Sequence, residues 1–346
     1  MRFVVTGGGT GGHIFPAIAV GARLAELGHE VHYVGSRTGL EARLVPKHGL
    51  RFHGLTAGKF DRTAFRPGEA FKVIRGLLEA RSLLRELRPD AVLATGGYAA
   101  FPFAFVAARA GVPLVVHEQN ARMGLANRWL APHARRLALA MPIPSAPAKA
   151  EVVGLPVREV RHDPQEARHA LGLEPDRPTL LVLGGSQGSK VLNEALPGLL
   201  EPYLETWQVL HQTGERWLEE TQGRVRHPHY HLAGFVDTTL AWAAAEIAIT
   251  RAGAMTLAEA AYHRVPLLLV PLPPEIDSGA QRANARLYQE RGAARMLDQG
   301  NWERFHDALA PLLDPARRAE MRRALATLSP EGAADRTARL VLEVVR

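Results

Sequence analysis

The sequence predicts an α/β protein made of two Rossmann-like domains. Its 346 residues suggest two domains, because one domain commonly takes roughly 150 residues. Strand-like and helix-like segments alternate, which is typical of parallel sheets with crossover helices. A strand followed by a glycine loop and a helix occurs twice, at residues 2–27 and 179–200. The 47% apolar and 22% charged content excludes a disordered chain, collagen and a coiled coil. The absence of cysteine excludes disulfides and thiolate metal sites.

The first half begins with an apolar strand at residues 2–6 and a glycine loop at 7–13. A helical pattern at 16–27 ends at a glycine and leads into a second strand at 30–34. The later elements of this half are expected as a strand at 91–94, a helix at 101–110 and a strand at 113–117.

The second half repeats this order with a strand at 179–183, a glycine loop at 184–188 and a helix at 189–200. A polar, proline-containing stretch at 158–178 marks the junction, so we expect domains at 1–157 and 158–334. A last helix at 335–346 is expected to pack back on the first domain. Further strands of the second half are expected at 207–211, 231–234, 246–250 and 266–270.

The first glycine loop has the spacing of a dinucleotide fingerprint, Gly7-x-Gly9-x-x-Gly12. Such glycines let backbone amides approach an anion at the start of a helix. An NAD site also needs an acidic residue at the end of the second strand, where this chain has Gly-Ser-Arg at 35–37. An NADP-dependent oxidoreductase that uses Arg37 therefore remains as an alternative, and an NAD enzyme is disfavoured.

Two later segments are also suited to binding a nucleotide or a sugar. The loop at 184–188 is not a P-loop, because Lys190 comes one place too late, but Ser186 stands near a helix start. In the segment 251–259, Thr256 can cap a helix or bind phosphate, and Glu259 can accept two ribose hydroxyls. A simple capping box is the structural alternative for that pair.

Histidines mark two further candidate positions. His13 directly follows the first glycine loop, where an imidazole can act as a base or a donor. The alternating histidines at 227, 229 and 231 could face one metal ion, but without a nearby carboxylate in the sequence a surface position is favoured.

The positive charge of the chain lies entirely in its first half. Residues 1–157 carry a balance of +10, whereas residues 158–346 carry −3. Either this is a solvated surface, or the first domain has an anionic partner such as lipid headgroups or nucleic acid.

An ordered set of motifs gives the chain a family resemblance. The motifs are Gly-Gly-Gly-Thr-Gly-Gly-His at 7–13, Gly-Gly-Tyr at 96–98, His-Glu-Gln-Asn at 117–120 with Gly-Leu-Ala-Asn at 124–127, Val-Gly-Leu-Pro-Val-Arg at 153–158, Gly-Gly-Ser-Gln-Gly at 184–188 and Arg-Ala-Gly-Ala-Met-Thr-Leu-Ala-Glu at 251–259. Together these motifs resemble the MurG family of peptidoglycan glycosyltransferases, over residues 6 to about 300.

The resemblance implies the GT-B fold, in which two Rossmann-like domains face each other across a cleft. It implies transfer of N-acetylglucosamine from UDP-N-acetylglucosamine to the 4-hydroxyl of the N-acetylmuramyl group of lipid I, with inversion, giving lipid II and UDP. The donor is expected mainly on the second domain and the acceptor on the first. No metal ion, no cofactor and no nucleic acid is expected to take part.

The resemblance also implies roles for individual residues. His13 is expected to be the general base, with Glu118 as the fallback or as a residue that orients its loop. Substrate contacts are expected from Thr10, Gly11, Gly12, Asn120, Arg158, Ser186, Gln187, Val236, Ala254, Met255, Thr256, Leu257, Ala258, Glu259 and Gln281.

Three positions depart from the family pattern and put individual contacts in doubt. Leu155 replaces an asparagine that is common before the proline, and Ala280 replaces the first residue of a Gln-Gln pair. The segment 273–277 is acidic where basic residues are more common. These departures concern the sugar contacts and the position of that loop.

The acceptor lipid implies a peripheral enzyme on the cytoplasmic face of the membrane. We expect an anionic membrane surface to be bound through residues 59–88, where Phe71, Ile74, Leu77 and Leu78 recur at helical spacing. The alternative is that these apolar residues face the core. The basic residues of this segment are Lys59, Arg62, Arg66, Lys72, Arg75, Arg81, Arg85 and Arg88, against four acidic ones.

Two further alternatives stay open. One is a UDP-sugar transferase with another glycolipid acceptor, which the His-Glu-Gln-Asn motif at 117–120 argues against. The other is a non-enzymatic sugar-nucleotide sensor, which a transfer assay would distinguish.

Overall fold

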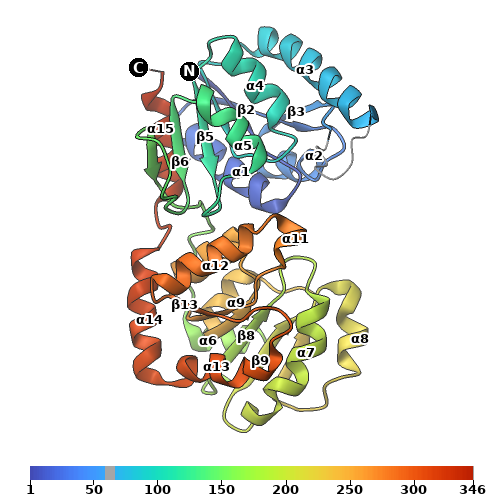
Figure 1. The fold of residues 1–346 in the computed structure, drawn as a ribbon, viewed down its shortest axis with the longest axis vertical. Helices are drawn as coiled ribbons and strands as arrows, with labels where there is room; N and C mark the ends of the chain where they lie inside the picture. The colour runs from blue at the N-terminus through green and yellow to red at the C-terminus, as the bar shows by residue number, and fades with distance from the viewer. Residues whose placement is uncertain (59–66, 346) are drawn as a thin grey trace. The chain divides into compact units, whose positions relative to one another are not determined.

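The computed structural model describes residues 1–58 and 67–345, and the chain divides into two compact units (Figure 1). The first unit comprises Met1–Val157 together with Pro330–Arg346, and the second comprises Arg158–Ser329. The chain therefore crosses from one unit to the other twice, at Val157 and again at Ser329.

The first unit contains a seven-stranded, all-parallel sheet in the order β3-β2-β1-β4-β5-β6-β7. Its strand β1 lies between β2 and β4, so that Phe3 is opposite both Val31 and Ala91. Its strands are β1 Arg2–Thr6, β2 Glu30–Ser36, β3 Arg51–Leu55, β4 Ala91–Ala94, β5 Leu114–Glu118, β6 Arg136–Leu139 and β7 Ala150–Val152. Its helices are α1 Gly11–Glu26, α2 Glu41–Leu44, α3 Pro67–Leu87, α4 Phe101–Arg109, α5 Leu125–Leu130 and α15 Ala333–Glu343, with short 3₁₀ turns at Val45–His48 and Ala131–His133.

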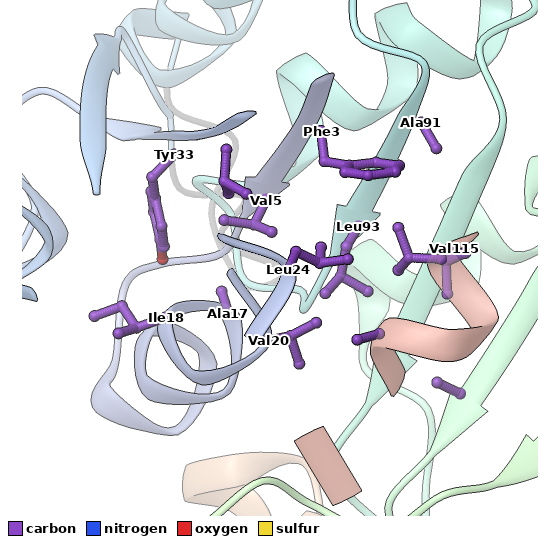
Figure 2. Close-up of a cluster of buried hydrophobic side chains, with 14 of the residues drawn as sticks. Phe3, Val5, Ala17, Ile18, Val20, Leu24, Tyr33, Ala91, Leu93 and Val115 are labelled. Carbon is purple, nitrogen blue, oxygen red and sulfur yellow. The ribbon is translucent and has the colours of Figure 1, made fainter. Parts of the chain in front are cut away.

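Both faces of this sheet are covered by helices, as its apolar strands require. On one face, Phe3, Val5 and Leu93 of the sheet pack in one cluster with Val20 and Leu24 of α1 (Figure 2). The last helix, α15, belongs to the same cluster through Ala338, Leu340 and Val341. The chain thus comes back to the first unit at its C-terminal end, and α15 helps to cover this face of the first sheet. The opposite face is covered by residues of α3, α4 and α5.

The second unit contains a six-stranded parallel sheet in the order β10-β9-β8-β11-β12-β13. Its apolar core includes Leu180, Val209, Ile249 and Phe305, all fully buried. Its strands are β8 Thr179–Leu183, β9 Gln208–Gln212, β10 Tyr230–Ala233, β11 Ala245–Thr250, β12 Leu267–Leu269 and β13 Ala294–Met296. Its helices are α6 Pro164–Ala170, α7 Lys190–Leu200, α8 Leu218–Gln222, α9 Thr238–Ala244, α10 Ala254–His263, α11 Pro274–Asp277, α12 Ala280–Glu290, α13 Phe305–Leu313 and α14 Pro315–Thr327, with 3₁₀ turns at Glu201–Tyr203, Glu215–Trp217 and Trp302–Arg304.

The two sheets reverse their strand order at equivalent places, between β1 and β4 and between β8 and β11. In open parallel sheets, ligands bind beyond the carboxyl ends of the strands at such a switch point. The glycine loop at 7–10 follows β1, and the loop at 184–189 follows β8. Each unit therefore places one glycine loop at its switch point.

The first helix begins earlier than the sequence pattern predicts. We expected it to start at Pro16, but α1 starts at Gly11. Thr10 has an extended backbone, and its carbonyl oxygen accepts from the amides of His13 and Ile14 at 3.1 and 3.2 Å. The two glycines therefore form the first helical turn, because this backbone geometry overrides their low helix propensity.

Candidate functional site

In the first unit, two glycine loops meet backbone to backbone at the switch point. The loop after β1 contains Gly8, and the loop after β4 contains Gly97 at a φ of +79°. A Cβ atom at Gly97 would lie 2.0 Å from the carbonyl oxygen of Gly8. Only glycine permits both this backbone conformation and this approach. The close contact fixes the loop that leads into α1.

The first turn of α1 presents backbone amides at this place. Thr10 is exposed, and within the described residues its side chain makes no capping hydrogen bond. Gly11 and Gly12 are the first helical residues, whose N–H groups have no partner within the helix. This helix end, with no acidic residue in its first turn, is suited to an anion.

The hydrogen bonds around His13 assign its tautomer. Its Nδ1 lies 3.0 Å from both the carbonyl oxygen of Thr95 and the Oε1 of Gln119. Gln119 donates its Nε2 to the carbonyl oxygens of Thr95 and His117, at 2.7 and 3.0 Å, so its oxygen must face His13. Because both neighbours are acceptors, Nδ1 carries the proton of the neutral ring. The lone pair then lies on Nε2, as a general base requires.

The carboxylate of Glu118 accepts hydrogen bonds from the segment that follows β5. Its carboxylate is buried and accepts from the amides of Asn120 and Gly124 at 3.0 and 2.8 Å. It also accepts from the side-chain amides of Asn120 and Asn127 at 3.2 and 2.9 Å. This carboxylate therefore orients Asn120 and closes the loop after β5. The geometry favours this role over that of the base.

His117, the first residue of the motif at 117–120, holds this motif through buried hydrogen bonds. It is fully buried, and burial lowers its pKa to about 4. Its Nε2 donates to the carbonyl oxygen of Gly154 at 3.0 Å, and its Nδ1 lies 3.3 Å from the Nε2 of Gln119. His117 is therefore a neutral structural link between β5 and the segment that follows β7.

In the second unit, Arg251 connects three loops at the switch point. It follows β11 directly and is buried, and this burial lowers its pKa. Its Nε donates to the Oγ of Ser189 at 3.1 Å, and its Nη1 donates to the carbonyl oxygen of Val270 at 3.0 Å. The loops after β8, β11 and β12 are thus held together around one positive charge.

The start of α10 lies beside this arginine. Its N-cap is Gly253, which has no side chain to satisfy the first amides, and the helix begins at Ala254. Ala254, Met255 and Thr256 are partly exposed, whereas the side chains of the next two residues are buried. This helix end offers unpaired N–H groups and the hydroxyl of Thr256 to an anion.

Glu259 stands one turn further along α10 and is positioned by a tryptophan. The indole Nε1 of Trp242, on α9, donates to its Oε2 at 3.0 Å. Burial raises the pKa of Glu259, while the Trp242 hydrogen bond and the charge of Arg158 oppose this shift. Trp242 itself is almost fully buried. No motif in the sequence points to Trp242.

Comparisons with known proteins agree with this arrangement. Residues 3–139 match the glycosyltransferase family 28 N-terminal domain, and residues 179–337 match its C-terminal domain. The chain is 53% identical, over 98% of both chains, to a UDP-N-acetylglucosamine--N-acetylmuramyl-(pentapeptide) pyrophosphoryl-undecaprenol N-acetylglucosamine transferase of Thermus thermophilus. A protein of the same name from Deinococcus deserti is 41% identical, over 98% of this chain and 97% of its own. The crystal structure of Acinetobacter baumannii MurG superposes with a TM-score of 0.81 at 29% identity, over 99% of each chain.

The chain belongs to the MurG branch of glycosyltransferase family 28. The predicted fold class, two Rossmann-like domains of the GT-B type, is thereby confirmed, and so is the predicted family. The chain is a glycosyltransferase, and neither the NADP oxidoreductase nor the transferase for another acceptor is favoured by these relatives.

The remaining predicted contacts of this glycosyltransferase lie on loops of the second unit. Ser186 and Gln187 are exposed in the loop after β8. Val236 is buried, whereas the neighbouring Phe235 is 70% exposed. The Oε1 of Gln281 accepts from the amides of Ala252 and Leu272, both at 3.2 Å.

Arg158 and Gln281 are held in different ways. Arg158 is largely exposed, and its Nη1 lies 3.6 Å from the Oδ1 of Asp237. Gln281 bridges the loops after β11 and β12 through its oxygen. The buried side chains of Leu257 and Ala258 leave these two residues only backbone contacts, and the amide of Leu257 is bonded to Gly253 within the helix.

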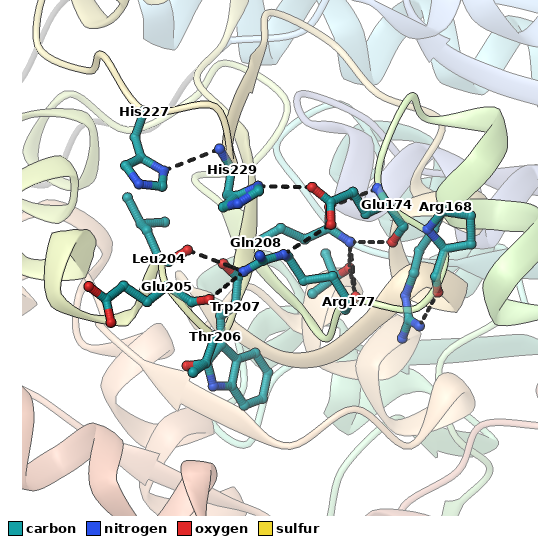
Figure 3. Close-up of polar contacts among 12 residues, drawn as sticks. Arg168, Glu174, Arg177, Leu204, Glu205, Thr206, Trp207, Gln208, His227 and His229 are labelled. Atoms are coloured by element: carbon teal, nitrogen blue, oxygen red, sulfur yellow. Dashed lines mark hydrogen bonds and ion pairs between the residues drawn. The ribbon is translucent and has the colours of Figure 1, made fainter.

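The histidines at 227, 229 and 231 lie at or just before the edge strand β10 of the second sheet, and Figure 3 shows His227 and His229. The Nδ1 of His229 is 3.0 Å from Glu174, and the Nδ1 of His227 accepts from the amide of His229. A carboxylate is therefore present that the sequence spacing did not reveal. Among the described residues, no set of histidine and acidic side chains has the arrangement of a metal site.

Within residues 1–58 and 67–345, no helix is long and apolar enough to cross a membrane.

Proposed function

We propose that this glycosyltransferase moves N-acetylglucosamine from UDP-N-acetylglucosamine to the 4-hydroxyl of the N-acetylmuramyl group of lipid I. The products are lipid II and UDP. The observation that carries this proposal is the 53% identity, over nearly the whole of both chains, to a relative named for this transfer. The tautomer of His13 and the anion-suited start of α10 supply chemistry that this reaction needs.

The transfer requires one proton to be removed and one leaving group to be stabilised. The acceptor oxygen attacks the anomeric carbon from the side opposite UDP, the bond to the diphosphate breaks, and the configuration inverts. The Nε2 of His13 takes the hydroxyl proton as the new bond forms. The departing diphosphate gains negative charge, which the amides at the start of α10 and the guanidinium of Arg158 stabilise.

The donor is held mainly by the second unit in this proposal. Glu259 accepts hydrogen bonds from the two ribose hydroxyls, with its orientation set by Trp242. Thr256 binds a phosphate oxygen, and the backbone at Val236 meets the uracil. Sugar contacts come from Ser186, Gln187 and Gln281, and from Thr10, Gly11, Gly12 and Asn120 of the first unit.

The helix α3 is the proposed contact with an anionic membrane surface. Its residues Phe71, Ile74 and Leu78 follow one another at spacings of three and four, and they are 66%, 58% and 67% exposed. They therefore form one apolar row on the solvent side of the helix. Leu77 is partly buried and does not belong to this row.

Basic residues accompany the apolar row of α3. Lys72, Arg75, Arg81 and Arg85 are exposed, which suits attraction to anionic headgroups. Lys72 and Arg75 also pair with Glu69 and Glu79 of the same helix, at 2.6 and 2.9 Å. Arg88 follows the end of the helix and is exposed as well. The predicted contributions of Lys59, Arg62 and Arg66 lie outside the described residues. Through this helix the enzyme would bind the cytoplasmic face of the membrane as a peripheral protein.

A transfer assay tests the proposed function directly. UDP release from UDP-N-acetylglucosamine is measured with a soluble lipid I analogue, without it, and with a glycolipid that lacks the N-acetylmuramyl group. We expect rapid release only with the lipid I analogue, and a product heavier by one N-acetylhexosamine. Equal UDP release with the other glycolipid would show that the N-acetylmuramyl group is not required of the acceptor. UDP release without sugar transfer would indicate a hydrolase.

A further inference from the structure

A buried carboxylate lies against the first glycine loop, and no motif of the sequence drew attention to it. Glu41 follows β2 by five residues and opens the short helix α2, yet its side chain is fully buried. Its Oε1 accepts from the amide of Ser36 at 2.9 Å, and its Oε2 accepts from the amide of Gly9 at 3.4 Å. Burying a charge is costly unless polar groups compensate it. The amides of Ser36 and Gly9 replace the water that would otherwise solvate this carboxylate.

The surroundings of Glu41 are shaped for this carboxylate. A Cβ atom placed on Gly8, Gly35 or Gly39 would lie only 2.4, 2.7 or 2.5 Å from atoms of its side chain. These three glycines, one in the loop after β1, one in β2 and one in the turn after β2, thus leave the space that the side chain fills. The Glu41 carboxylate therefore fills the space that these glycines leave.

The position of the Glu41 carboxylate can be compared with that of the acidic residue in dinucleotide-binding domains. In dinucleotide-binding Rossmann domains, an acidic residue at the end of the second strand reads the ribose, and the glycine loop amides meet the pyrophosphate. Here the end of β2 reads Gly-Ser-Arg, but Glu41 returns to the Ser36 amide and also reaches the glycine loop. A carboxylate of this chain is therefore bonded to an amide of the glycine loop, the kind of group that would meet the pyrophosphate of a dinucleotide.

The loop that Glu41 holds carries Thr10 and leads into the first turn of α1, where His13 lies. Its other restraints are uncharged: the hydroxyl of Tyr33 donates to the carbonyl oxygen of Gly7 at 2.7 Å, and the amide of Gly8 donates to Gly96 at 3.3 Å. The ring of Tyr98 lies over Gly9, where a Cβ atom would be 2.7 Å from it. Among these restraints, Glu41 alone brings a charge.

We propose that Glu41 is a positioning residue that serves as the built-in anion of the first glycine loop. It fixes the loop so that Thr10 and His13 are presented to the reaction, and it closes the loop to dinucleotides. This inference rests on the proposed transfer reaction, because its effect is seen in the turnover of that reaction.

Chemical rescue tests this role. In the Glu41→Ala variant, the atoms removed correspond to one acetate ion. We expect kcat to fall about 10²-fold, since small errors in the placement of reacting groups cost that much, while the KM for UDP-N-acetylglucosamine changes little. Acetate should restore kcat in a saturable way, and propionate, which is larger, should restore it less. Chloride at equal ionic strength should have no effect.

The matched control is Asp163→Ala. The Oδ1 of Asp163 accepts from two backbone amides, those of Gln165 and Glu166 at 2.9 and 3.0 Å, but it caps α6 in the second unit. This variant should keep its kcat and gain nothing from acetate. If Glu41→Ala does not fold, Glu41→Gln keeps the volume but offers a donor to one amide, and its kcat should fall with the donor KM unchanged.

The outcomes separate the two proposals. A wild-type protein that transfers no sugar would refute the proposed function. A wild-type protein that turns over, beside a folded Glu41→Ala variant with unchanged kcat or with a loss that acetate does not restore, would refute the role of Glu41. An unchanged kcat in Glu41→Gln would refute it as well.

Discussion

The Nδ1–H of His13 donates to two acceptors, and this fixes the tautomer in which Nε2 is free to accept a proton. Thr95 and Gln119 face Nδ1 at 3.0 Å each, so the neutral ring keeps its lone pair on Nε2. A histidine fixed in this way can accept a proton without first changing tautomer. The same contacts hold the ring in one orientation.

We therefore expect His13→Gln to lower kcat by about 10²–10⁴-fold, the usual contribution of a general base. The affinity for UDP-N-acetylglucosamine, measured by calorimetry, should change much less. His48→Gln, an exposed histidine of the same unit, is the control and should keep full turnover. A variant of His13 with turnover within a few-fold of the wild type would show that the residue is structural.

Glu259 allows a sharper test, because its proposed partner is a pair of ribose hydroxyls. The wild-type protein should bind UDP more tightly than 2′-deoxy-UDP. Glu259→Ala should weaken UDP by several-fold or more, since a hydrogen bond to a charged group contributes about 1.5–3 kcal/mol, and it should abolish the preference for ribose. Trp242→Phe should reduce this preference in part, because the carboxylate loses its 3.0 Å donor. An unchanged ribose preference in Glu259→Ala would remove Glu259 from the site.

At this scale the sequence named candidate residues, but it did not show which atoms those residues bind. The motif at 117–120 named Glu118 as a possible base, and the structure shows it bonded to Gly124 and Asn127. Those bonds depend on how the loop returns to β5, which spacing does not reveal. The roles of Gln119, Trp242 and Glu41 depend on non-local contacts in the same way.

Elements show a second kind of discrepancy, between local propensity and tertiary context. Residues 11–15 contain two glycines and read as a loop, yet they form the start of α1, because the extended backbone of Thr10 lets its carbonyl oxygen accept from the amides of the first turn. The helix α3 shows the reverse case. Its exposed apolar row has the spacing of a core-facing stripe, and only the structure shows that Phe71, Ile74 and Leu78 face away from the sheet.

This row leads to a prediction about binding to membranes. We expect wild-type protein to co-sediment with anionic vesicles at low salt and to be released as salt rises. Replacing Lys72, Arg75 and Arg81 together by Glu should weaken binding by about 10²-fold or more, because each basic residue near an anionic surface adds about 1 kcal/mol. Serine at Phe71 and Leu78 should weaken the binding that remains at high salt.

The control for charge alone uses the second unit. Replacing Arg304, Arg317 and Arg323 by Glu makes the same change in net charge at exposed positions far along the chain. This variant should keep most of its vesicle binding. Wild-type protein that stays in solution at low salt, or a control that loses as much binding as the α3 variant, would contradict the prediction.

At the scale of the molecule, the sequence predicted the repeat of two Rossmann-like halves and the strands at the centre of each sheet. Edge elements were harder, because β3, β7 and β13 are short or exposed and carry little periodic signal. The interior strands β1 and β8 carry continuous runs of apolar residues and are buried on both faces. Burial on both faces explains why they were the easiest to predict.

Each unit also contains a histidine that is buried in its neutral form. His117 lies in the first unit and His211 in the second, where the Nδ1 of His211 accepts from the Tyr230 hydroxyl at 2.9 Å and its Nε2 donates to Asn193 at 3.0 Å. Burial lowers the pKa of His117 to about 4 and that of His211 to about 3. In the unfolded chain both rings take up a proton near pH 6.5.

The pH dependence of stability follows from this difference. As the pH falls below about 6.5, the unfolded chain binds protons that the folded chain does not, so the folded state loses stability until the pH approaches 4 for His117 and 3 for His211. We expect each histidine to cost about 1–2 kcal/mol between pH 7 and pH 5. Urea unfolding at several pH values, followed by circular dichroism, measures this loss. His117→Gln and His211→Gln should each be less stable at pH 7 yet lose less stability on acidification, whereas the exposed His48→Gln should keep the wild-type slope. If both buried-site variants lose stability with pH as steeply as the wild type, the acid sensitivity comes from other groups.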